Sequence, residues 1–305
     1  MCPQQPTTPK ILSDPEQAIR DFIPTKKFFI GIDSDGCVFD SMEIKHQECF
    51  APMFIKHFGL QSVSKYAREV WIFVNLYSKT RGCNRFHALI LALEMLSNRE
   101  DVKSRGAVIP SCPALNAWVE NENKLGNTAL DAEVARGNDL LIPVQSWSNA
   151  VNTAVKDIVH GVPPFPLVRD TLVEANNLAD CFVISQTPTE ALEREWSENN
   201  LREFVRLIAG QEMGTKTEHL SLAAKDKYKP DKILMIGDAP GDYKAAKANK
   251  ALFFPIIPGC EEASWEQLHN EGLAKFFSGK YSGDYQKKLL NEFEASLPER
   301  PNWNN

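Results

Sequence analysis

Five short apolar runs constrain the fold of this chain more than any other feature. Each run has five residues and is bounded by turn residues, which is typical of a buried strand and too short for a helix. The runs lie at 28–32, 181–185, 205–209, 233–237 and 252–256, and helical patterns at 190–198, 217–224 and 243–249 separate the later ones. Strands that alternate with helices pair in parallel. The sequence therefore predicts an α/β fold with a doubly wound, Rossmann-like parallel sheet.

The segment between the first two runs has a different pattern. From 42 to 162 the apolar residues recur at helical spacing, with one predicted loop at 98–113, and no strand is predicted. We therefore predict a helical domain at 42–162, inserted into a core that is built from 15–41 and 163–305.

Both ends of the chain differ from this core. Residues 1–14 are rich in Pro, Gln and Thr and predict a loose arm, and Asp14-Pro15 predicts the start of a short helix at 16–23. Aromatic and apolar residues between 265 and 293 follow helical spacing and predict a C-terminal helical extension. For that extension the sequence suggests no function. The tail PERPNWNN, at 298–305, is predicted to fray.

Composition excludes several classes of protein. The chain has 34 Lys and Arg against 40 Asp and Glu, a formal net charge of −6, so its surface would repel nucleic acid. It has no apolar stretch long enough for a membrane helix, and its start lacks a signal-peptide pattern, so we expect a cytoplasmic protein. Seven scattered cysteines predict reduced thiols. Nothing in the sequence indicates the oligomeric state.

Four acids follow two of the predicted strands. Asp33 and Asp35 come after the first run, and Asp238 and Asp242 after the fourth. Ligands bind at the carboxyl ends of strands in open α/β sheets, so these acids would converge at one edge. Each pair alone could be a polar turn, with Asp242 capping the next helix. Four converging carboxylates need a compensating cation, and oxygen ligands favour Mg²⁺.

A serine and a lysine complete the predicted site. Ser185 ends the second run, where its hydroxyl could either bind a phosphoryl oxygen or cap the next helix. Lys216 follows the third run and opens a helix, which places it at the same edge as the acids. The other candidates, Lys225, Lys227 and Lys229, precede the fourth run and belong at the opposite edge.

These pieces, in this order, resemble the haloacid dehalogenase-like superfamily of phosphohydrolases. The match consists of DxDGxxxDS at 33–41, a strand that ends in Ser185, Lys216, and a GDxxxD motif with its acids at 238 and 242. The resemblance implies that 42–162 is a helical cap over the site. It also implies a Mg²⁺-dependent phosphatase for a small, anionic phosphorylated metabolite.

The resemblance implies a role for each matched residue. Asp33 would be the nucleophile that forms an aspartyl phosphate, and Asp35 the general acid and base. Ser185 and Lys216 would bind the phosphoryl oxygens. The Mg²⁺ ligands would be Asp33, the backbone carbonyl of Asp35, Asp238 and, directly or as a support, Asp242.

The loop at 78–85 is the polar link between two apolar helices of the cap. Arg81, Asn84 and Arg85 in this loop could bind the anionic substrate, or the loop could be an exposed turn. Two other functions share the core motifs: a phosphomutase and a non-catalytic phospho-binding module. The acid at 35 and the large cap disfavour the binding module.

Overall fold

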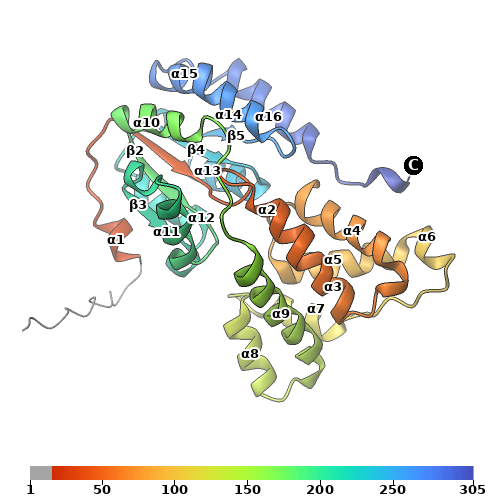
Figure 1. Ribbon diagram of the computed structural model, residues 1–305. Coiled ribbons are helices and arrows are strands. Elements are labelled where there is room, and N and C mark those ends of the chain that lie inside the picture. Colours follow the sequence, from red (N-terminus) through yellow and green to blue (C-terminus); the bar gives the residue numbers. More distant parts are fainter. Residues whose placement is uncertain (1–15, 305) are drawn as a thin grey trace, which may run out of the picture.

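A five-stranded parallel sheet forms the centre of the molecule (Figure 1). The computed structural model describes residues 16–304. The strand order is β3-β2-β1-β4-β5, so β1 is central and the chain winds outward on both sides of it. The strands are β1 Phe28–Ile32, β2 Ala179–Ile184, β3 Leu207–Ala209, β4 Ile233–Gly237 and β5 Leu252–Pro255. This arrangement confirms the predicted Rossmann-like α/β fold.

The strands are continuous apolar runs because both faces of the sheet are buried. On one face Ile30 and Ile32 join a cluster that includes Trp196 and Trp265. On the other face Phe29 packs in a second cluster. At the centre of β1, a Cβ on Gly31 would lie 2.7 Å from Ile184 Cδ1, so a larger residue there would require the Ile184 side chain to shift.

The other elements of the core and of its C-terminal extension are helices and single turns. They are α1 Gln17–Arg20, α10 Val168–Leu178, α11 Thr189–Glu198, η4 Arg202–Phe204, η5 Gln211–Met213, α12 Lys216–Ala224, η6 Pro230–Lys232, α13 Pro240–Ala248, α14 Glu261–Gln267, η7 Leu268–Gly272, α15 Leu273–Phe277, α16 Asp284–Ser296 and η8 Asn302–Asn304. The helix predicted at 16–23 is shorter than expected, and its predicted cap, Asp14, lies outside the described residues. The third strand starts later than predicted because η4 occupies the residues just before Val205.

Between β1 and α10 every element is helical. These elements are α2 Ser41–Ile44, η1 Lys45–Phe50, α3 Ala51–His57, η2 Gln61–Val63, α4 Ser64–Leu76, α5 Arg85–Asn98, α6 Glu100–Lys103, α7 Pro113–Asn121, α8 Asn127–Ala135, η3 Asp139–Leu141 and α9 Ile142–Ile158. The prediction of an uninterrupted loop at 98–113 was wrong, because it contains α6. This helical segment buries its own apolar cluster, in which the ring centroids of Trp71 and Trp147 lie 5.7 Å apart.

Two chain segments connect the helical segment to the sheet, and they lie side by side. Phe39 forms a bridge with Pro164, and Phe165 N donates to Val38 O at 2.9 Å. The outgoing and returning chains are therefore joined just beyond the sheet.

After β5 the chain packs back on the sheet and then leaves it. Tyr281 in this region is fully buried and donates its hydroxyl to Phe253 O at 2.7 Å. After α16 the chain runs toward α4 of the helical segment (Figure 1). The prediction of a frayed tail was wrong for the described residues, because Trp303 packs against the apolar cluster of that segment.

Candidate active site

Three of the four predicted acids meet at the carboxyl edge of the sheet. Asp33 follows β1, Asp238 follows β4, and Asp242 lies in the first turn of α13. One carboxylate oxygen of each lies within 4.8 Å of the others. All three residues are buried, with exposed fractions of 5%, 1% and 0%. The convergence expected from the strand ends is thus present for these three residues.

Lys216 is the first residue of α12 and lies among these acids. Its Nζ donates to Asp33 Oδ2 and to Asp242 Oδ1, each at 2.6 Å. The helix starts there because Thr215 and Glu218 form a reciprocal capping box. Of the lysines weighed from the sequence, the chosen one is therefore in contact with the acids.

Burial governs the charges of this cluster. It raises the pKa of Asp33 to about 6 although Lys216 acts in the opposite direction. Burial also raises the pKa of Asp238 to about 6, opposed by Arg81. Burial would lower the pKa of Lys216, but the nearby carboxylates of Asp242 and Asp33 raise it overall. The lysine is therefore a stable ammonium group.

Arg81 reaches the acids from the helical segment. It lies between α4 and α5 and is 4% exposed. Its Nε donates to Asp238 Oδ2 at 2.7 Å, its Nη2 lies 2.7 Å from the same oxygen, and its Nη1 donates to Leu76 O at 2.8 Å. Gly36 makes room for it, since a Cβ there would lie 2.6 Å from Arg81 Nη2. This ion pair joins the helical segment to the sheet.

The carboxylate of Asp35 has a separate set of partners. Lys45 Nζ donates to its Oδ1 at 2.5 Å, Ser41 Oγ donates to the same oxygen, and Thr187 Oγ1 donates to Oδ2 at 2.6 Å. Burial would raise the pKa of Asp35, but Lys45 and these hydrogen bonds lower it to about 2. Asp35 is therefore ionised in this arrangement, and its side chain does not join the other three acids.

Sequence reasoning missed Lys45 and missed the hydroxyl of Thr187. One signal for Lys45 was available: it follows Ser41 by four residues in a helical stretch, so the two share a face next to Asp35. Thr187 lies in the turn after β2, and no sequence pattern related it to Asp35.

The remaining predicted residues lie apart from the acid cluster or have other contacts. Ser185 follows β2, is 2% exposed, and its Oγ accepts from Thr187 N at 3.3 Å. Asn84 caps α5, where its Oδ1 accepts from Phe86 N at 3.0 Å. Arg85 Nη1 donates to Asn152 Oδ1 at 2.7 Å inside the helical segment. Of the three loop residues, only Arg81 contacts the acids, and the substrate roles of Asn84 and Arg85 stay predictions.

The acids fit a hard divalent cation. Asp238 Oδ1 is buried and has no hydrogen-bond partner among the described residues. Asp242 differs, because its Oδ1 accepts from Lys216 and its Oδ2 from Ala239 N at 3.0 Å. Three carboxylates face two cationic side chains, which leaves one surplus negative charge. Asp33 is also engaged, since its Oδ1 accepts from Ser34 N at 2.8 Å and its Oδ2 from Lys216. The donor set suits Mg²⁺, with Asp238 Oδ1 as the unpartnered side-chain oxygen and Asp33 beside it.

Comparison with known proteins finds a family similarity over part of the chain. Residues 127–254 match the family described as haloacid dehalogenase-like hydrolase. This part of the chain is similar to haloacid dehalogenase-like hydrolases. The matched range contains Ser185, Lys216 and both late acids, whereas Asp33 and Arg81 precede it. No curated protein matches the sequence.

Solved structures with a similar fold carry related descriptions. A haloacid dehalogenase-like family hydrolase from Streptococcus pneumoniae is 13% identical, with a TM-score of 0.41, over 80% of this chain and 92% of that one. A predicted phosphatase from Clostridium acetobutylicum is 14% identical, with a TM-score of 0.42, over 82% of this chain and 100% of that one.

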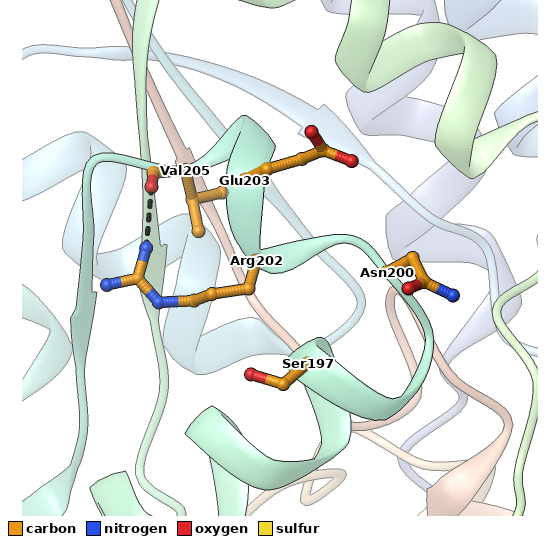
Figure 2. Close-up of a pocket in the computed structure, with 5 residues that line it drawn as sticks. All are labelled: Ser197, Asn200, Arg202, Glu203 and Val205. Carbon is orange, nitrogen blue, oxygen red and sulfur yellow. Dashed lines mark hydrogen bonds between the residues drawn. The ribbon is translucent and has the colours of Figure 1, made fainter.

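A surface hollow lies elsewhere, before the start of β3 (Figure 2). It is lined by Ser197, Asn200, Arg202, Glu203 and Val205. The guanidinium of Arg202 is already engaged, donating to Val205 O at 2.8 Å and to Glu193 at 2.7 Å. The hollow adjoins the amino end of β3, whereas the acids follow the carboxyl ends of their strands. No helix among the described residues is long and apolar enough to cross a membrane.

Proposed function

We propose that this protein is a Mg²⁺-dependent phosphatase that acts on a small phosphorylated metabolite through an aspartyl phosphate on Asp33. The observation that carries the proposal is the pairing of the buried Asp33 with Lys216 at 2.6 Å, beside an unpartnered oxygen of Asp238. A carboxylate that attacks a phosphate needs neighbouring positive charge, because both groups are anionic. Asp33, Asp238 and the backbone carbonyl of Asp35, with Asp242 in support, would hold Mg²⁺, which would supply further positive charge.

The reaction has two displacement steps. Asp33 attacks phosphorus, the bond to the leaving oxygen breaks, and Asp35 donates a proton to the departing alcohol. Asp35 then takes a proton from water, which attacks the aspartyl phosphate, releases inorganic phosphate and regenerates Asp33. Ser185 and Lys216 hold the phosphoryl oxygens in both steps. Dividing one difficult displacement into two lowers the barrier of each.

The proposed role of Asp35 requires that its contact with Lys45 change during the reaction. A general acid must be protonated when the leaving group departs. In the arrangement described, Asp35 is held ionised by Lys45 at 2.5 Å. The contact between Lys45 and Asp35 therefore has to loosen, or transfer its proton, when substrate occupies the site.

We further propose that residues 42–162 act as the cap. Two features support this role: the segment has its own apolar cluster, and it sends Arg81 to Asp238. Because the acids are buried, a phosphate ester must displace part of the Arg81 loop to reach Asp33. Movement about the paired connections at Phe39 and Pro164 would admit it.

An activity panel tests this function. Purified protein is assayed for release of inorganic phosphate from a set of phosphate esters, with and without Mg²⁺. Turnover should require Mg²⁺, and Asp33→Asn should abolish it, while Asp231→Asn at an exposed acid should leave it unchanged. Wild-type turnover in Asp33→Asn would contradict the mechanism. Isomerisation of a sugar phosphate without net phosphate release would indicate a phosphomutase, and binding without turnover would indicate a phospho-binding module.

A further inference from the structure

The end of the chain connects the sheet to the helical segment. Leu297 is buried in the apolar cluster of the sheet, where Phe293 of α16 also packs. The next residues form the C-terminal tail, 298–304, which runs from α16 toward α4 (Figure 1). Pro301 is buried, and Trp303 packs against the apolar cluster of the helical segment. The tail therefore leads from the sheet, where Leu297 is buried, to the helical segment.

Trp303 anchors the tail on the helical segment. Its ring meets Phe73 of α4 edge to face, with centroids 5.4 Å apart. The guanidinium of Arg99 lies 4.6 Å from the Trp303 ring, and Arg99 is itself fixed by Glu69 at 2.6 Å. Aromatic and cation–π contacts of this kind each contribute measurable binding. The tail is thus held at its far end by a specific, partly buried contact.

The near end of the tail contacts the loop that carries Arg81. Lys79 N donates to Pro298 O at 3.3 Å, and Lys79 Nζ lies 2.9 Å from Glu299 Oε1. The ion pair is exposed and contributes little, so the backbone hydrogen bond is the more important of the two contacts. Lys79 is two residues before Arg81, and Arg81 N donates to Ser78 O at 2.9 Å. Lys79 and Arg81 therefore belong to one hydrogen-bonded turn.

We propose that the C-terminal tail positions Arg81 over the active site, with Trp303 as the anchor and Lys79 as the point of contact. The proposal rests on the proposed function, in which a phosphate ester displaces part of the Arg81 loop to reach Asp33. Trp303 and Lys79 touch neither the substrate nor the acids, so they are positioning residues. This gives the C-terminal extension a role: it holds the Arg81 loop against Asp238 and limits where that loop can move.

The test compares Trp303→Ala with the conservative variant Trp303→Phe, both in the full chain. Hydrogen exchange is measured on residues 78–83 without substrate. Trp303→Ala should speed exchange in this loop at least about tenfold, because it removes two ring contacts. Trp303→Phe, which keeps a ring, should stay close to the wild type. In the ester assay, Trp303→Ala should lower KM about tenfold with kcat little changed, because a looser Arg81 loop is displaced more easily by the ester.

Three results separate the outcomes. Faster exchange confined to 299–304, with unchanged exchange at 78–83 and unchanged KM, would overturn the proposal. If Trp303→Ala does not fold, hydrogen exchange of the Lys79 amide is measured in the wild type instead. Slow exchange supports the contact with the tail. Exchange at the rate of an open loop refutes it. The exchange results do not depend on catalysis, so a failure of the phosphatase assay would leave them standing.

Discussion

Gly36 allows the closest contact between the helical segment and the acids. It has φ +74°, and a Cβ at this position would lie 2.6 Å from Arg81 Nη2 and 2.7 Å from Asp238 Oδ2. Both atoms belong to one buried ion pair with a 2.7 Å contact. A methyl group at Gly36 would therefore disrupt the buried ion pair between Arg81 and Asp238.

Gly36→Ala tests this contact against a matched control. Gly106 has a similar φ of +64° but no atom within 4 Å of its would-be Cβ. Gly106→Ala should cost about 1 kcal/mol in unfolding free energy, from backbone strain alone. Gly36→Ala should cost about 3 kcal/mol more, because it also disrupts a buried charge pair. Urea unfolding of both variants measures the difference, and equal losses would contradict the close packing at Gly36.

At the scale of elements, the start of β2 is fixed by one buried acid. Asp180 is 1% exposed, and its carboxylate accepts from Thr25 N at 2.8 Å, Lys26 N at 2.9 Å and Tyr228 Oη at 2.7 Å. Arg206 lies 3.9 Å away. Burial would raise the pKa of Asp180, but these hydrogen bonds bring it below its usual value. The acid thus ties the segment before β1 to the start of β2.

The depressed pKa of Asp180 makes its contribution depend on pH. The stabilisation is fully present above its ordinary pKa of 3.8 and is lost as the pH falls through the lower folded value. Asp180→Asn should therefore lower the unfolding free energy by about 2 kcal/mol at pH 7, and by less as the pH drops below about 4. Urea unfolding across this range measures the effect. A difference that stays constant with pH would show that charge plays no part.

Elements differ in how well the sequence predicts them. The runs at β1 and β4 were placed without error, because strands buried on both faces are apolar throughout. Lys216 was found because it opens a helix after a strand, and both features are local. The contact of Arg81 with Asp238 was not predictable, since it joins residues 157 positions apart on separate apolar clusters. The packing of Trp303 against the helical segment was not predictable for the same reason.

At the scale of the whole molecule, the acid cluster connects metal binding to folding. The surplus negative charge and the free oxygen of Asp238 exist only when β1 and β4 are paired. Mg²⁺ at about 100 times its dissociation constant should therefore stabilise the protein by about 2.7 kcal/mol. Thermal unfolding with Mg²⁺, against NaCl of equal ionic strength, measures this. Asp238→Asn should lose most of the shift, and an equal shift in that variant would argue against this site.

The position of the helical segment in the chain has a consequence for how the protein is made. Phe28 of β1 pairs with Ala179 of β2 and Phe29 pairs with Ile233 of β4, so both neighbours of the central strand are synthesised much later. A growing chain that has finished β1 has no strand to pair it with until the whole helical segment has emerged from the ribosome. The helical segment buries its own apolar cluster. All of its residues are synthesised before the second strand of the sheet.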